Sequence, residues 1–342
     1  MKDKESDRYI IRSNHLNTSM EFGNIDIPEN LPQSAFLITD DNLYANYPEF
    51  INQFRHICIK PGEASKNPET VLHIYEQLKA EKIDRHSVIL GFGGGVVTDI
   101  AGFVAATYLR GVPLILIPTS LLAMADAAVG GKNGINYAGI KNMIGTVRQP
   151  DATQIDSNFL ETLPDEHYKN GLAEMLKIAF IMDEELIKEL EDSVNDILNR
   201  KTVVLNKLLH RACQLKIRLV ENDEQDKNIR HILNFGHSLG HAIEMEDRTL
   251  HGLAVSKGMI AAMRLSMKYS GLKESEYLRC RELMQAFDLP VEFEMKDAYW
   301  KYLVHDKKRK EGKLSFIFLE SAGNAVIRKI DFQDVKKLLY AT

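Results

Sequence analysis

The residues with the clearest chemical potential are two histidines in the segment Gly236-His237-Ser238-Leu239-Gly240-His241. Because residues four apart share one face of a helix, both imidazoles can face the same cavity. His251 follows ten residues after His241, where the next predicted helix begins. Two helical histidines and one from a neighbouring segment suit a divalent metal ion such as zinc, which at catalytic sites takes three protein ligands and keeps one position open.

Glu174 offers a carboxylate to the same ion. It lies in an apolar helical pattern at residues 171–177. Burying an unpaired charge there is unfavourable, so a metal or another cation explains the residue best. A structural hydrogen-bonding role would explain any one of the histidines, but three histidines together with a buried glutamate favour the metal site.

Three consecutive glycines indicate a second site. Gly93-Gly94-Gly95 follows a predicted strand at residues 87–92 and precedes a helical pattern that begins at Val96. Such a turn lets the backbone approach a ligand, and the free N–H groups at the helix start favour a phosphate or pyrophosphate. The pattern is not the G-x-G-x-x-G fingerprint of Rossmann folds, and a purely structural turn is the alternative.

Basic and amide side chains stand beside these glycines and histidines, inside otherwise apolar segments. Each one alone is also explained as a surface group, but together they favour a polar pocket for a highly anionic substrate. They are Arg110, Lys132, Lys141, Asn142, Lys216, Arg230 and Asn234. The basic run at residues 307–310 is expected to be a solvated loop, with an anion-binding lysine as the alternative.

The elements that must hold these residues differ between the two halves of the chain. Residues 1–150 contain 13 of the 21 glycines and 8 of the 10 prolines. This half alternates strand patterns with helical stretches, which predicts parallel pairing and an α/β fold. The strand patterns lie at residues 35–39, 56–59, 87–92 and 114–117, with a helical stretch at 68–82.

Residues 151–342 are predicted to form a mainly α-helical domain, because apolar residues recur there at helical spacing. The predicted helices lie at residues 166–192, 194–221, 230–246, 251–270 and 274–287. Two short strands are predicted near the C-terminus, at residues 314–319 and 325–330.

Length and charge exclude several classes of protein. The 342 residues suggest two domains, and the net charge of −5 provides no large basic field for nucleic acid or an anionic membrane. The longest apolar stretch, residues 112–129, contains two prolines and Asp126, which excludes a membrane span. Three widely spaced cysteines and a charged N-terminus without a signal-peptide pattern indicate a cytoplasmic protein.

Several motifs along nearly the whole chain resemble those of the 3-dehydroquinate synthase family, a group of sugar phosphate cyclases. The N-terminal half has Pro61-Gly62-Glu63-Ala64-Ser65-Lys66, the glycine turn with Asp99, Ala106-Thr107-Tyr108-Leu109-Arg110-Gly111, Pro118-Thr119-Ser120, and residues 126–142. The C-terminal half has Gly171-Leu172-Ala173-Glu174, Leu233-Asn234-Phe235-Gly236-His237, Gly240-His241-Ala242-Ile243-Glu244, His251-Gly252 and His305-Asp306-Lys307-Lys308. Agreement of this extent is specific to that family.

The resemblance implies an NAD-binding α/β domain with a parallel sheet at residues 1–150, a mainly helical metal- and substrate-binding domain at residues 151–342, and an active site in the cleft between them. Glu174, His237 and His251 correspond to the family's ligands for zinc or cobalt. The NAD site corresponds to Asp40, Asn42, Glu63, Lys66, Gly94, Gly95, Val96, Asp99, Thr119, Ser120, Lys132, Lys141, Phe159, Leu160, Glu161 and Thr162. The substrate site corresponds to Asp126, Lys132, Asn142, Lys177, Lys216, Arg230, Asn234, His241 and one lysine of the pair Lys307 and Lys308.

Members of that family convert 3-deoxy-D-arabino-heptulosonate 7-phosphate into 3-dehydroquinate and phosphate, in the shikimate pathway to aromatic amino acids. NAD+ transiently oxidises the substrate, phosphate is eliminated, the hydride returns and an aldol reaction closes the ring, while the metal stabilises alkoxide and enolate charge. The resemblance assigns the phosphate to Lys132, Asn142 and a lysine near 307, the carboxylate to Lys216, Arg230 and Asn234, and proton transfer or orientation to His241. Arg110 corresponds to an arginine that reaches the neighbouring subunit's active site, which implies a homodimer.

The sequence departs from the family pattern at several positions. Leu253 stands where glutamate is usual, which removes a possible hydrogen-bond partner of a metal ligand. Asn133 replaces a common threonine, and Asp226 replaces a longer glutamate that is assigned proton transfer in some members. No departure removes a proposed metal ligand.

Three alternatives remain open. Another sugar phosphate cyclase would use a substrate without a carboxylate, and the presence of Lys216, Arg230 and Asn234 argues against it. A glycerol dehydrogenase-like enzyme that uses NAD and a metal would release NADH, whereas Lys132 and Asn142 favour the cyclase. A catalytically inactive NAD-binding regulator is expected to have lost metal ligands that this chain keeps.

Overall fold

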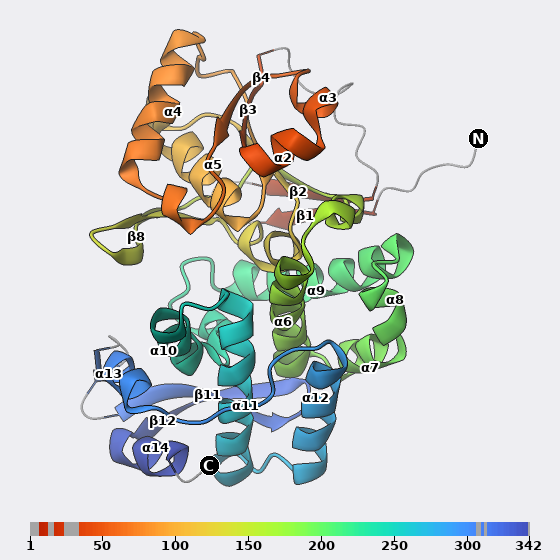
Figure 1. Cartoon of the computed structure of the whole chain (residues 1–342), viewed down its shortest axis with the longest axis vertical. Helices are drawn as coiled ribbons and strands as arrows, with labels where there is room; N and C mark the ends of the chain where they lie inside the picture. Colours follow the sequence, from red (N-terminus) through yellow and green to blue (C-terminus); the bar gives the residue numbers. More distant parts are fainter. Residues whose placement is uncertain (1–6, 13–16, 24–33, 306–308, 311–312, 341–342) are drawn as a thin grey trace. The chain divides into compact units, whose positions relative to one another are not determined.

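The computed structural model of the chain describes residues 7–12, 17–23, 34–305, 309–310 and 313–340, and its helices and strands are drawn in Figure 1. The chain divides into two compact units, Met1–Leu163 with Lys216–Gln225, and Pro164–Leu215 with Asp226–Thr342. The predicted fold class is confirmed, because the first unit is built on a largely parallel sheet and the second is mainly helical. The division into functional domains at residue 150 stays a prediction. No helix in the described ranges is long and apolar enough to cross a membrane.

A seven-stranded sheet forms the centre of the first unit, in the order β1-β2-β9-β6-β5-β3-β4. Its pairings are parallel except for the antiparallel edge pair β1 and β2. The strands are β1 (Asp7–Arg12), β2 (Asn17–Phe22), β3 (Phe36–Asp40), β4 (Arg55–Ile59), β5 (Ile89–Gly93), β6 (Leu114–Pro118) and β9 (Ala152–Ile155). The four predicted strand patterns form β3 to β6, whereas β1, β2 and β9 have no strong apolar pattern and were not predicted.

Helices cover both faces of this sheet (Figure 1). Successive side chains of a strand point to opposite faces, so neighbouring residues of β3 meet different helices. Ile38 packs with residues of α4 (Pro68–Ala80) and α5 (Gly95–Thr107). Leu37 packs on the other face with residues of α2 (Asp41–Asn46) and α3 (Pro48–Ile51). Both helical layers therefore bury apolar surface against one sheet, and the loops at its edge are held by a rigid core.

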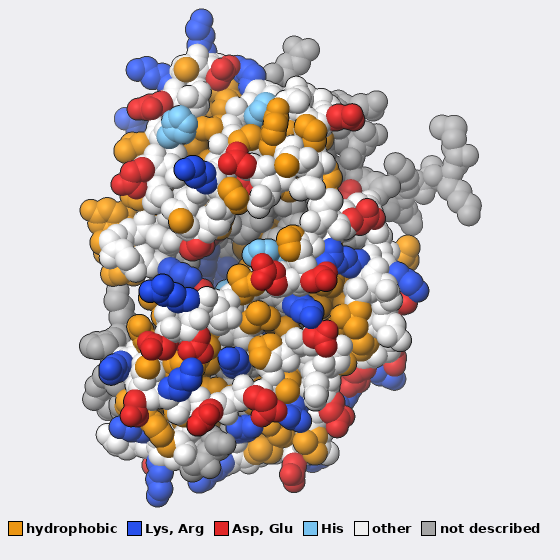
Figure 2. All heavy atoms as spheres, in the orientation of Figure 1, with side chains coloured by type: hydrophobic (Ala, Val, Ile, Leu, Met, Phe, Trp, Pro, Cys, Tyr) orange, Lys and Arg blue, Asp and Glu red, His pale blue; other side chains and the backbone are white. Residues whose placement is uncertain are grey.

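The first unit also contains a two-stranded hairpin of β7 (Lys132–Tyr137) and β8 (Ile140–Val147). Ala138 and Gly139 at its tip have φ values of 50° and 78°, as a type I′ turn requires. Hydrophobic side chains of this hairpin are exposed and gather where it projects in Figure 2. Short helical turns complete the unit: η1 (Glu63–Ser65), η2 (Tyr108–Arg110), η3 (Ala123–Ala127) and η4 (Ser157–Thr162).

The second unit is mainly helical, as predicted. Its helices are α6 (Asp165–Met182), α7 (Glu184–Asp192), α8 (Val194–Leu198), most of α9 (Thr202–Asn222), α10 (His237–Asp247), α11 (His251–Tyr269), α12 (Glu274–Ala286), α13 (Asp297–His305) and α14 (Phe332–Leu339). The turn η5 (Ile229–Asn234) precedes α10, and the strands β10 (Arg309–Lys310), β11 (Lys313–Ser321) and β12 (Asn324–Asp331) form a small antiparallel sheet. The two predicted C-terminal strands are β11 and β12.

Three predicted helices are interrupted in the structure. The prediction of a single helix at 166–192 is wrong, because the helix ends before Asp183. The Asp183 side chain accepts hydrogen bonds from the first turn of α7 and so starts a new helix. The helix predicted at 194–221 is wrong at Arg200, whose φ of 54° separates α8 from α9. The helix predicted at 230–246 is wrong at Gly236, whose φ of 74° makes α10 begin at His237.

Candidate metal centre and nucleotide site

Three side chains from three helices converge in the second unit. Glu174 lies within α6, His237 is the first residue of α10 and His251 is the first residue of α11. The Nε2 atoms of His237 and His251 lie 3.7 and 3.4 Å from Oε1 of Glu174, and one ligand atom of each residue lies within 4.8 Å of the other two. The structure therefore brings together the three residues that the sequence singled out. One carboxylate and two imidazoles form a donor set that suits zinc or cobalt.

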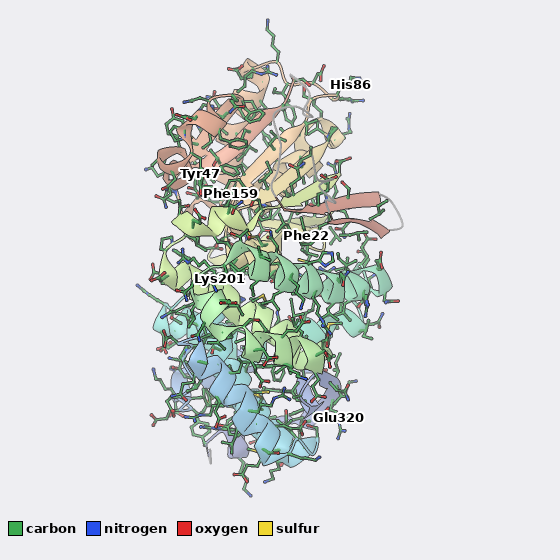
Figure 3. The ribbon with its side chains drawn as sticks, turned by 90° about the vertical axis from the view of Figure 1, so that its right-hand side faces the viewer. Phe22, Tyr47, His86, Phe159, Lys201 and Glu320 are labelled. Carbon is green, nitrogen blue, oxygen red and sulfur yellow. The ribbon has the colours of Figure 1, made fainter. Side chains whose placement is uncertain are left out.

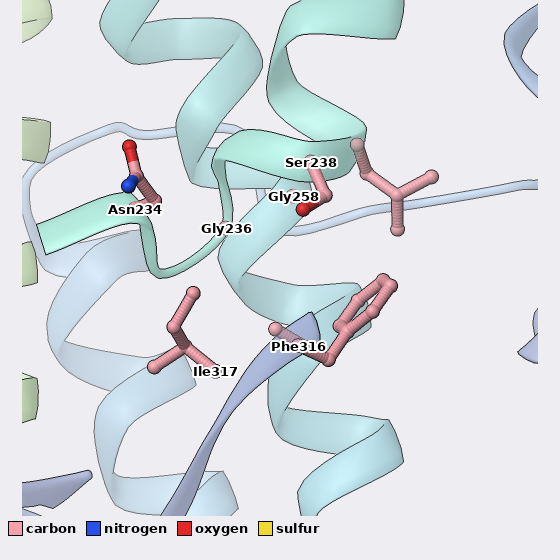
Figure 4. Close-up of a pocket in the computed structure, with 8 residues that line it drawn as sticks. Asn234, Gly236, Ser238, Gly258, Phe316 and Ile317 are labelled. Carbon is pink, nitrogen blue, oxygen red and sulfur yellow. The ribbon is translucent and has the colours of Figure 1, made fainter. Parts of the chain in front are cut away.

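Glycines let the two histidine-bearing helices approach closely. A Cβ atom at Gly258 of α11 would lie 2.0 Å from the carbonyl oxygen of Gly236, and one at Gly252 would lie 2.0 Å from the carbonyl oxygen of Asn170 on α6. The Gly252 N–H donates a 2.6 Å hydrogen bond to Oδ1 of Asn170, which fixes the start of α11 on α6. Figure 4 shows the small cavity beside this crossing, where Gly236 and Gly258 lie near Phe316.

Hydrogen bonds on the far side of each imidazole fix which nitrogen faces the cluster. Nδ1 of His237 lies 3.1 Å from the carbonyl oxygen of Phe235, and Nδ1 of His251 lies 2.9 Å from Oε2 of Glu244. A proton on each Nδ1 serves these acceptors and leaves the Nε2 lone pair for a metal, as metal-binding histidines commonly do. Glu244 thus provides the orienting carboxylate that Leu253 cannot.

The charges around Glu174 keep its carboxylate ionised. Glu174 is fully buried and forms an ion pair with Lys177 one turn later on α6. Apart from that ion pair, neither oxygen has a hydrogen-bond partner of good geometry among the described residues, so the oxygen that faces the two histidines is available to a cation. Burial would raise the pKa of Glu174, but Lys177 and the two histidines hold it well below its usual range. A metal ion would therefore find the carboxylate in its binding form.

The same environment shifts the pKa values of the two histidines in opposite directions. Burial, helped by the Lys177 charge, holds the pKa of His237 well below its usual range. Burial alone would also lower the pKa of His251, but the nearby carboxylates of Glu174 and Glu244 raise it to about 9. Because a metal ligand must be neutral imidazole, metal binding at His251 is coupled to loss of its proton.

Glu244 was missed by the sequence analysis, although its spacing carries a signal. It lies seven residues after His237, and two helical turns return to the same face.

We expect Glu244→Ala to weaken zinc binding roughly 10- to 100-fold, the usual effect of removing an orienting partner. Glu244→Gln is expected to lose less, because an amide oxygen still accepts the His251 hydrogen bond. The measurement is competition with a chelating dye; Glu246→Ala, an exposed change on the same helix, is the control, and unchanged affinity in Glu244→Ala would contradict the role.

The other predicted residues of the second unit lie on the segment that leads into α10 and on α10 itself. The ring of His241 lies 5.3 Å from that of His237 and 5.9 Å from that of His251, measured between centroids. Arg230 is buried and Asn234 is half-buried, both in η5. His241 is thus beside the candidate ligands but exposed, which suits a group that exchanges protons with a substrate.

In the first unit, the glycine turn has the predicted geometry. β5 ends at Gly93 and α5 begins at Gly95. Gly94 caps the helix without a side-chain hydrogen bond, so the first N–H groups of α5 remain available to an anionic ligand. Thr119 and Ser120 follow the neighbouring strand β6, and the Thr119 N–H donates to the carbonyl oxygen of Gly93 at 3.0 Å. The predicted residues of two adjacent strands therefore meet at one edge of the sheet.

Two further parts of the predicted NAD set are joined by an aromatic contact. The Tyr47 ring lies 5.4 Å from the Phe159 ring, and its hydroxyl lies 2.9 Å from that of Thr162; Figure 3 shows Tyr47 beside Phe159. Leu160 and Glu161 lie with them in η4. Tyr47 directly follows the short helix α2, which Asp40 caps by accepting a hydrogen bond from the third residue of the helix. Asn42 lies in that helix, so residues far apart in sequence are held near each other.

The predicted substrate residues of the first unit lie on η3, the hairpin and the end of α9. The buried Lys216 forms an ion pair with Asp126. Lys132 begins β7, and Lys141 and Asn142 lie on the exposed part of β8. Arg110, with a φ of 65°, is exposed at the end of η2. Lys307 and Lys308 lie outside the described residues.

Lys66 and Asp99 form a polar pair beside the glycine turn. The two side chains make an ion pair in which Lys66 is 5% exposed and Asp99 is 18% exposed. Burial raises the pKa of Asp99 to about 6, against the lowering effect of Lys66, and the nearby charges of Glu63 and Asp126 also raise it. The folded protein therefore holds a proton on Asp99 more tightly than the unfolded chain does. The stability that this preference contributes is full below the ordinary aspartate pKa of 3.8 and is lost as the pH rises through about 6.

We expect NAD+ affinity to fall as the pH falls, because an ionised Asp99 accepts hydrogen bonds from cofactor hydroxyl groups better than a protonated one. With the pKa of Asp99 near 6, the NAD+ dissociation constant should rise about tenfold between pH 7 and pH 5. Titration calorimetry measures this, with circular dichroism to verify folding at pH 5. Asp99→Asn should bind weakly and lose the pH dependence, and a flat wild-type profile would exclude this role.

Comparisons with known proteins agree with this geometry. The family model for the 3-dehydroquinate synthase N-terminal region matches residues 56–170, and the model for the C-terminal region matches residues 171–309. The 3-dehydroquinate synthase of Clostridium tetani is 38% identical over 316 residues, which is 89% of this chain and 84% of that protein. The enzyme of the same name from Acetivibrio thermocellus is 41% identical over 289 residues, 83% of this chain and 80% of its own.

A solved structure shares the whole architecture. The 2-epi-5-epi-valiolone synthase ValA from Streptomyces hygroscopicus subsp. jinggangensis, solved with NAD+ and Zn2+ bound, superposes with a TM-score of 0.87 at 28% identity. The match covers 96% of this chain and 97% of that one. Both units thus have counterparts in one solved protein.

Proposed function

This chain belongs to the 3-dehydroquinate synthase family, and we propose on that basis that it converts 3-deoxy-D-arabino-heptulosonate 7-phosphate into 3-dehydroquinate and phosphate. It is an enzyme that uses NAD and a divalent metal ion. The observation that carries the proposal is the convergence of Glu174, His237 and His251 on one point. A chain that had lost the chemistry would have no need to keep a buried carboxylate between two imidazoles.

We assign the metal to this cluster. The buried Glu174, without a hydrogen-bond partner of good geometry in the described part of the chain, supports the assignment, and so does the orientation of both Nε2 atoms. When bound, the divalent ion supplies Lewis acidity toward substrate oxygens and the nicotinamide supplies a reversible hydride acceptor. Three protein ligands leave coordination positions for a substrate.

The NAD site is assigned to the first unit. The uncapped start of α5, the pair of Lys66 and Asp99, and the contact of Tyr47 with η4 support this assignment. The assigned residues are Asp40, Asn42, Glu63, Lys66, Gly94, Gly95, Val96, Asp99, Thr119, Ser120, Lys132, Lys141, Phe159, Leu160, Glu161 and Thr162. Their role is to hold the cofactor firmly, because the same NAD must accept and return one hydride.

The substrate carries two anionic groups, and we assign a cationic set to each. Lys132 and Lys307, with Asn142, would bind the phosphate, and Lys216 and Arg230, with Asn234, would bind the carboxylate. Asp126 supports the second set by holding the Lys216 ammonium in an ion pair. Lys177, buried against Glu174, adds positive charge near the metal cluster. His241 is assigned proton transfer or orientation, since it is one turn from His237.

The direct test supplies purified protein with the heptulosonate phosphate, NAD+ and zinc or cobalt. The proposed reaction releases phosphate stoichiometrically with no net rise in NADH absorbance, because the hydride is returned within one turnover. Accumulation of NADH would instead indicate a dehydrogenase. Turnover of a sugar phosphate without a carboxylate, in preference to the heptulosonate, would indicate another cyclase.

We also propose a homodimer that works in the cytoplasm. Arg110 is exposed next to Leu109, an exposed apolar residue with a φ of 48°. Met143 and Ile144 expose further apolar surface on β8, of the kind that subunit interfaces cover. The three cysteines are unpaired, as in a reducing compartment. Light scattering should give twice the chain mass, and a monomer at micromolar concentration would contradict the dimer.

A further inference from the structure

The hairpin β7–β8 contains a bulge that its sequence did not reveal. Ile135 pairs with Ile144, but Tyr137 pairs with Ile140. The single residue Asn136 therefore lies opposite residues 141–143 of β8. Bulges of this kind change the direction of side chains and occur often beside active sites. Here the extra residues include Lys141 and Asn142, both of which carry proposed ligand contacts.

Asn136 makes three hydrogen bonds at this bulge. Its backbone N–H donates to the carbonyl oxygen of Lys66 at 2.8 Å. Its Nδ2 group donates to Oε1 of Glu63 at 2.8 Å, and its Oδ1 atom accepts from the backbone N–H of Asn142 at 2.9 Å. One side chain thus connects the bulge to the segment that contains η1, which lies far away in sequence.

The bond to Asn142 also supports an unusual backbone conformation. Asn142 has a φ of 51°, a left-handed conformation that glycine adopts most readily and asparagine adopts more readily than most other residues. Its N–H lies in a bulge, where the ladder offers no regular acceptor. The Oδ1 atom of Asn136 supplies that acceptor. Without this hydrogen bond, the left-handed conformation at Asn142 would be less stable.

We propose that Asn136 is a positioning residue that sets the bulge bearing Lys141 and Asn142 and couples it to Glu63 and Lys66 of the NAD site. The inference rests on the proposed function for the identity of both ligands. Its two side-chain bonds have separate roles: Oδ1 orients Asn142, which is assigned to the phosphate, and Nδ2 orients Glu63, which is assigned to the cofactor. Asn136 itself needs no contact with either ligand.

The two roles separate with two substitutions. Asn136→Ala removes both bonds, and we expect the dissociation constants of NAD+ and of inorganic phosphate to rise about tenfold each. Asn136→Asp keeps an oxygen for the Asn142 N–H but places a second carboxylate against Glu63. It should weaken NAD+ binding at least tenfold, since like charges at hydrogen-bond distance repel. The same charge lies beside Asn142 and should also weaken phosphate binding, so the role of Glu63 is read from NAD+ affinity in the paired background.

A second substitution, at Glu63, should cancel the effect of Asn136→Asp on NAD+ binding. In Asn136→Asp combined with Glu63→Gln, the new amide can donate to the new carboxylate, which restores the bond with opposite polarity. We therefore expect Asn136→Asp to weaken NAD+ binding strongly in the wild-type background and hardly at all in the Glu63→Gln background. A merely structural effect of Asn136→Asp would be the same in both backgrounds and would overturn the proposal.

Titration calorimetry with NAD+, phosphate inhibition of turnover and thermal unfolding complete the experiment. Gln53→Ala, which removes a surface amide that donates to the Glu49 carbonyl oxygen of its own helical segment, is the matched control and should bind both ligands normally. Asn136→Ala with wild-type affinity for NAD+ and phosphate overturns the inference even if the wild type turns over the heptulosonate phosphate. Failure of that turnover in the wild type refutes the proposed function instead, while the contrast between the two backgrounds for NAD+ still tests the coupling.

Discussion

His237→Ala is expected to leave a folded protein that no longer retains zinc and turns over at least a thousandfold more slowly. His237 supplies one of three converging donor atoms, and two ligands hold a zinc ion far less tightly than three. Lewis-acid stabilisation of substrate charge is worth several kcal/mol. Each 1.36 kcal/mol is a factor of ten in rate, so the loss of about 4 kcal/mol gives about three orders of magnitude.

The fold should survive this change, because Glu174 keeps its ion pair with Lys177. The truncation leaves a cavity at a largely buried position, which should cost roughly 1–3 kcal/mol of stability. Metal content after dialysis, phosphate release and thermal unfolding measure the three effects. A His237→Ala protein with full zinc content would remove His237 from the ligand set.

His241→Ala is the informative comparison. His241 lies one turn further along α10 and is exposed. It should retain zinc but lose turnover, because its proposed role is proton transfer. If His241→Ala loses the metal while His237→Ala keeps it, the second candidate group of His241, Glu244 and His251 would explain the site better.

The metal cluster was predictable because its residue types are rare in apolar helices. Glu174 and three candidate histidines were found from spacing and apolar context, as was the glycine turn at α5, whereas the family resemblance was needed to separate His241 from the ligands. The strands β3, β5 and β6 were predicted for a related reason: they are almost entirely buried and read as short apolar runs. In each case the local residue pattern indicates directly whether the segment is buried.

The missed features depend on contacts between distant residues. The strand β2, next to the edge strand β1, is short and partly polar, and its parallel neighbour β9 lies more than a hundred residues away, so no local signal marks β2 or β9. The helix breaks at Asp183 and Arg200 arise from a cap and a left-handed residue that helical periodicity does not detect. Asn136 is an ordinary asparagine in sequence, and only the register of β7 with β8 shows its position opposite Asn142.

The hydrogen bond of Glu244 is an intermediate case. Its position on the same face as His237 was available from helical spacing, but its contact with His251 needs the crossing of α10 and α11. That crossing is set by glycines, and no sequence pattern marks these glycines as important for the site. Gly258 of α11 packs against Gly236 and Gly240 at the start of α10. The geometry of the metal cluster therefore depends on residues that touch no ligand.

Gly258→Ala is accordingly expected to weaken zinc binding about a hundredfold, although it lies outside the ligand set. The added Cβ would lie 2.0 Å from the carbonyl oxygen of Gly236 and 2.9 Å from the backbone nitrogen of Gly240. Both are backbone atoms, so the contact is relieved only if the start of α10 moves. His237 is the first residue of that helix, and losing the groups that orient a metal ligand typically costs about 10- to 100-fold in metal affinity.

Overpacking of this kind also destabilises the fold, by roughly 1–3 kcal/mol, so the two effects must be separated. Lys257→Ala, at the preceding position of α11, keeps the crossing and should bind zinc normally. Zinc affinity from dye competition, compared with thermal unfolding of the same samples, shows whether the loss of affinity exceeds the loss of stability. Gly258→Ala with normal zinc affinity would mean that the helices can separate without moving His237 away from Glu174, and the close crossing would then serve packing alone.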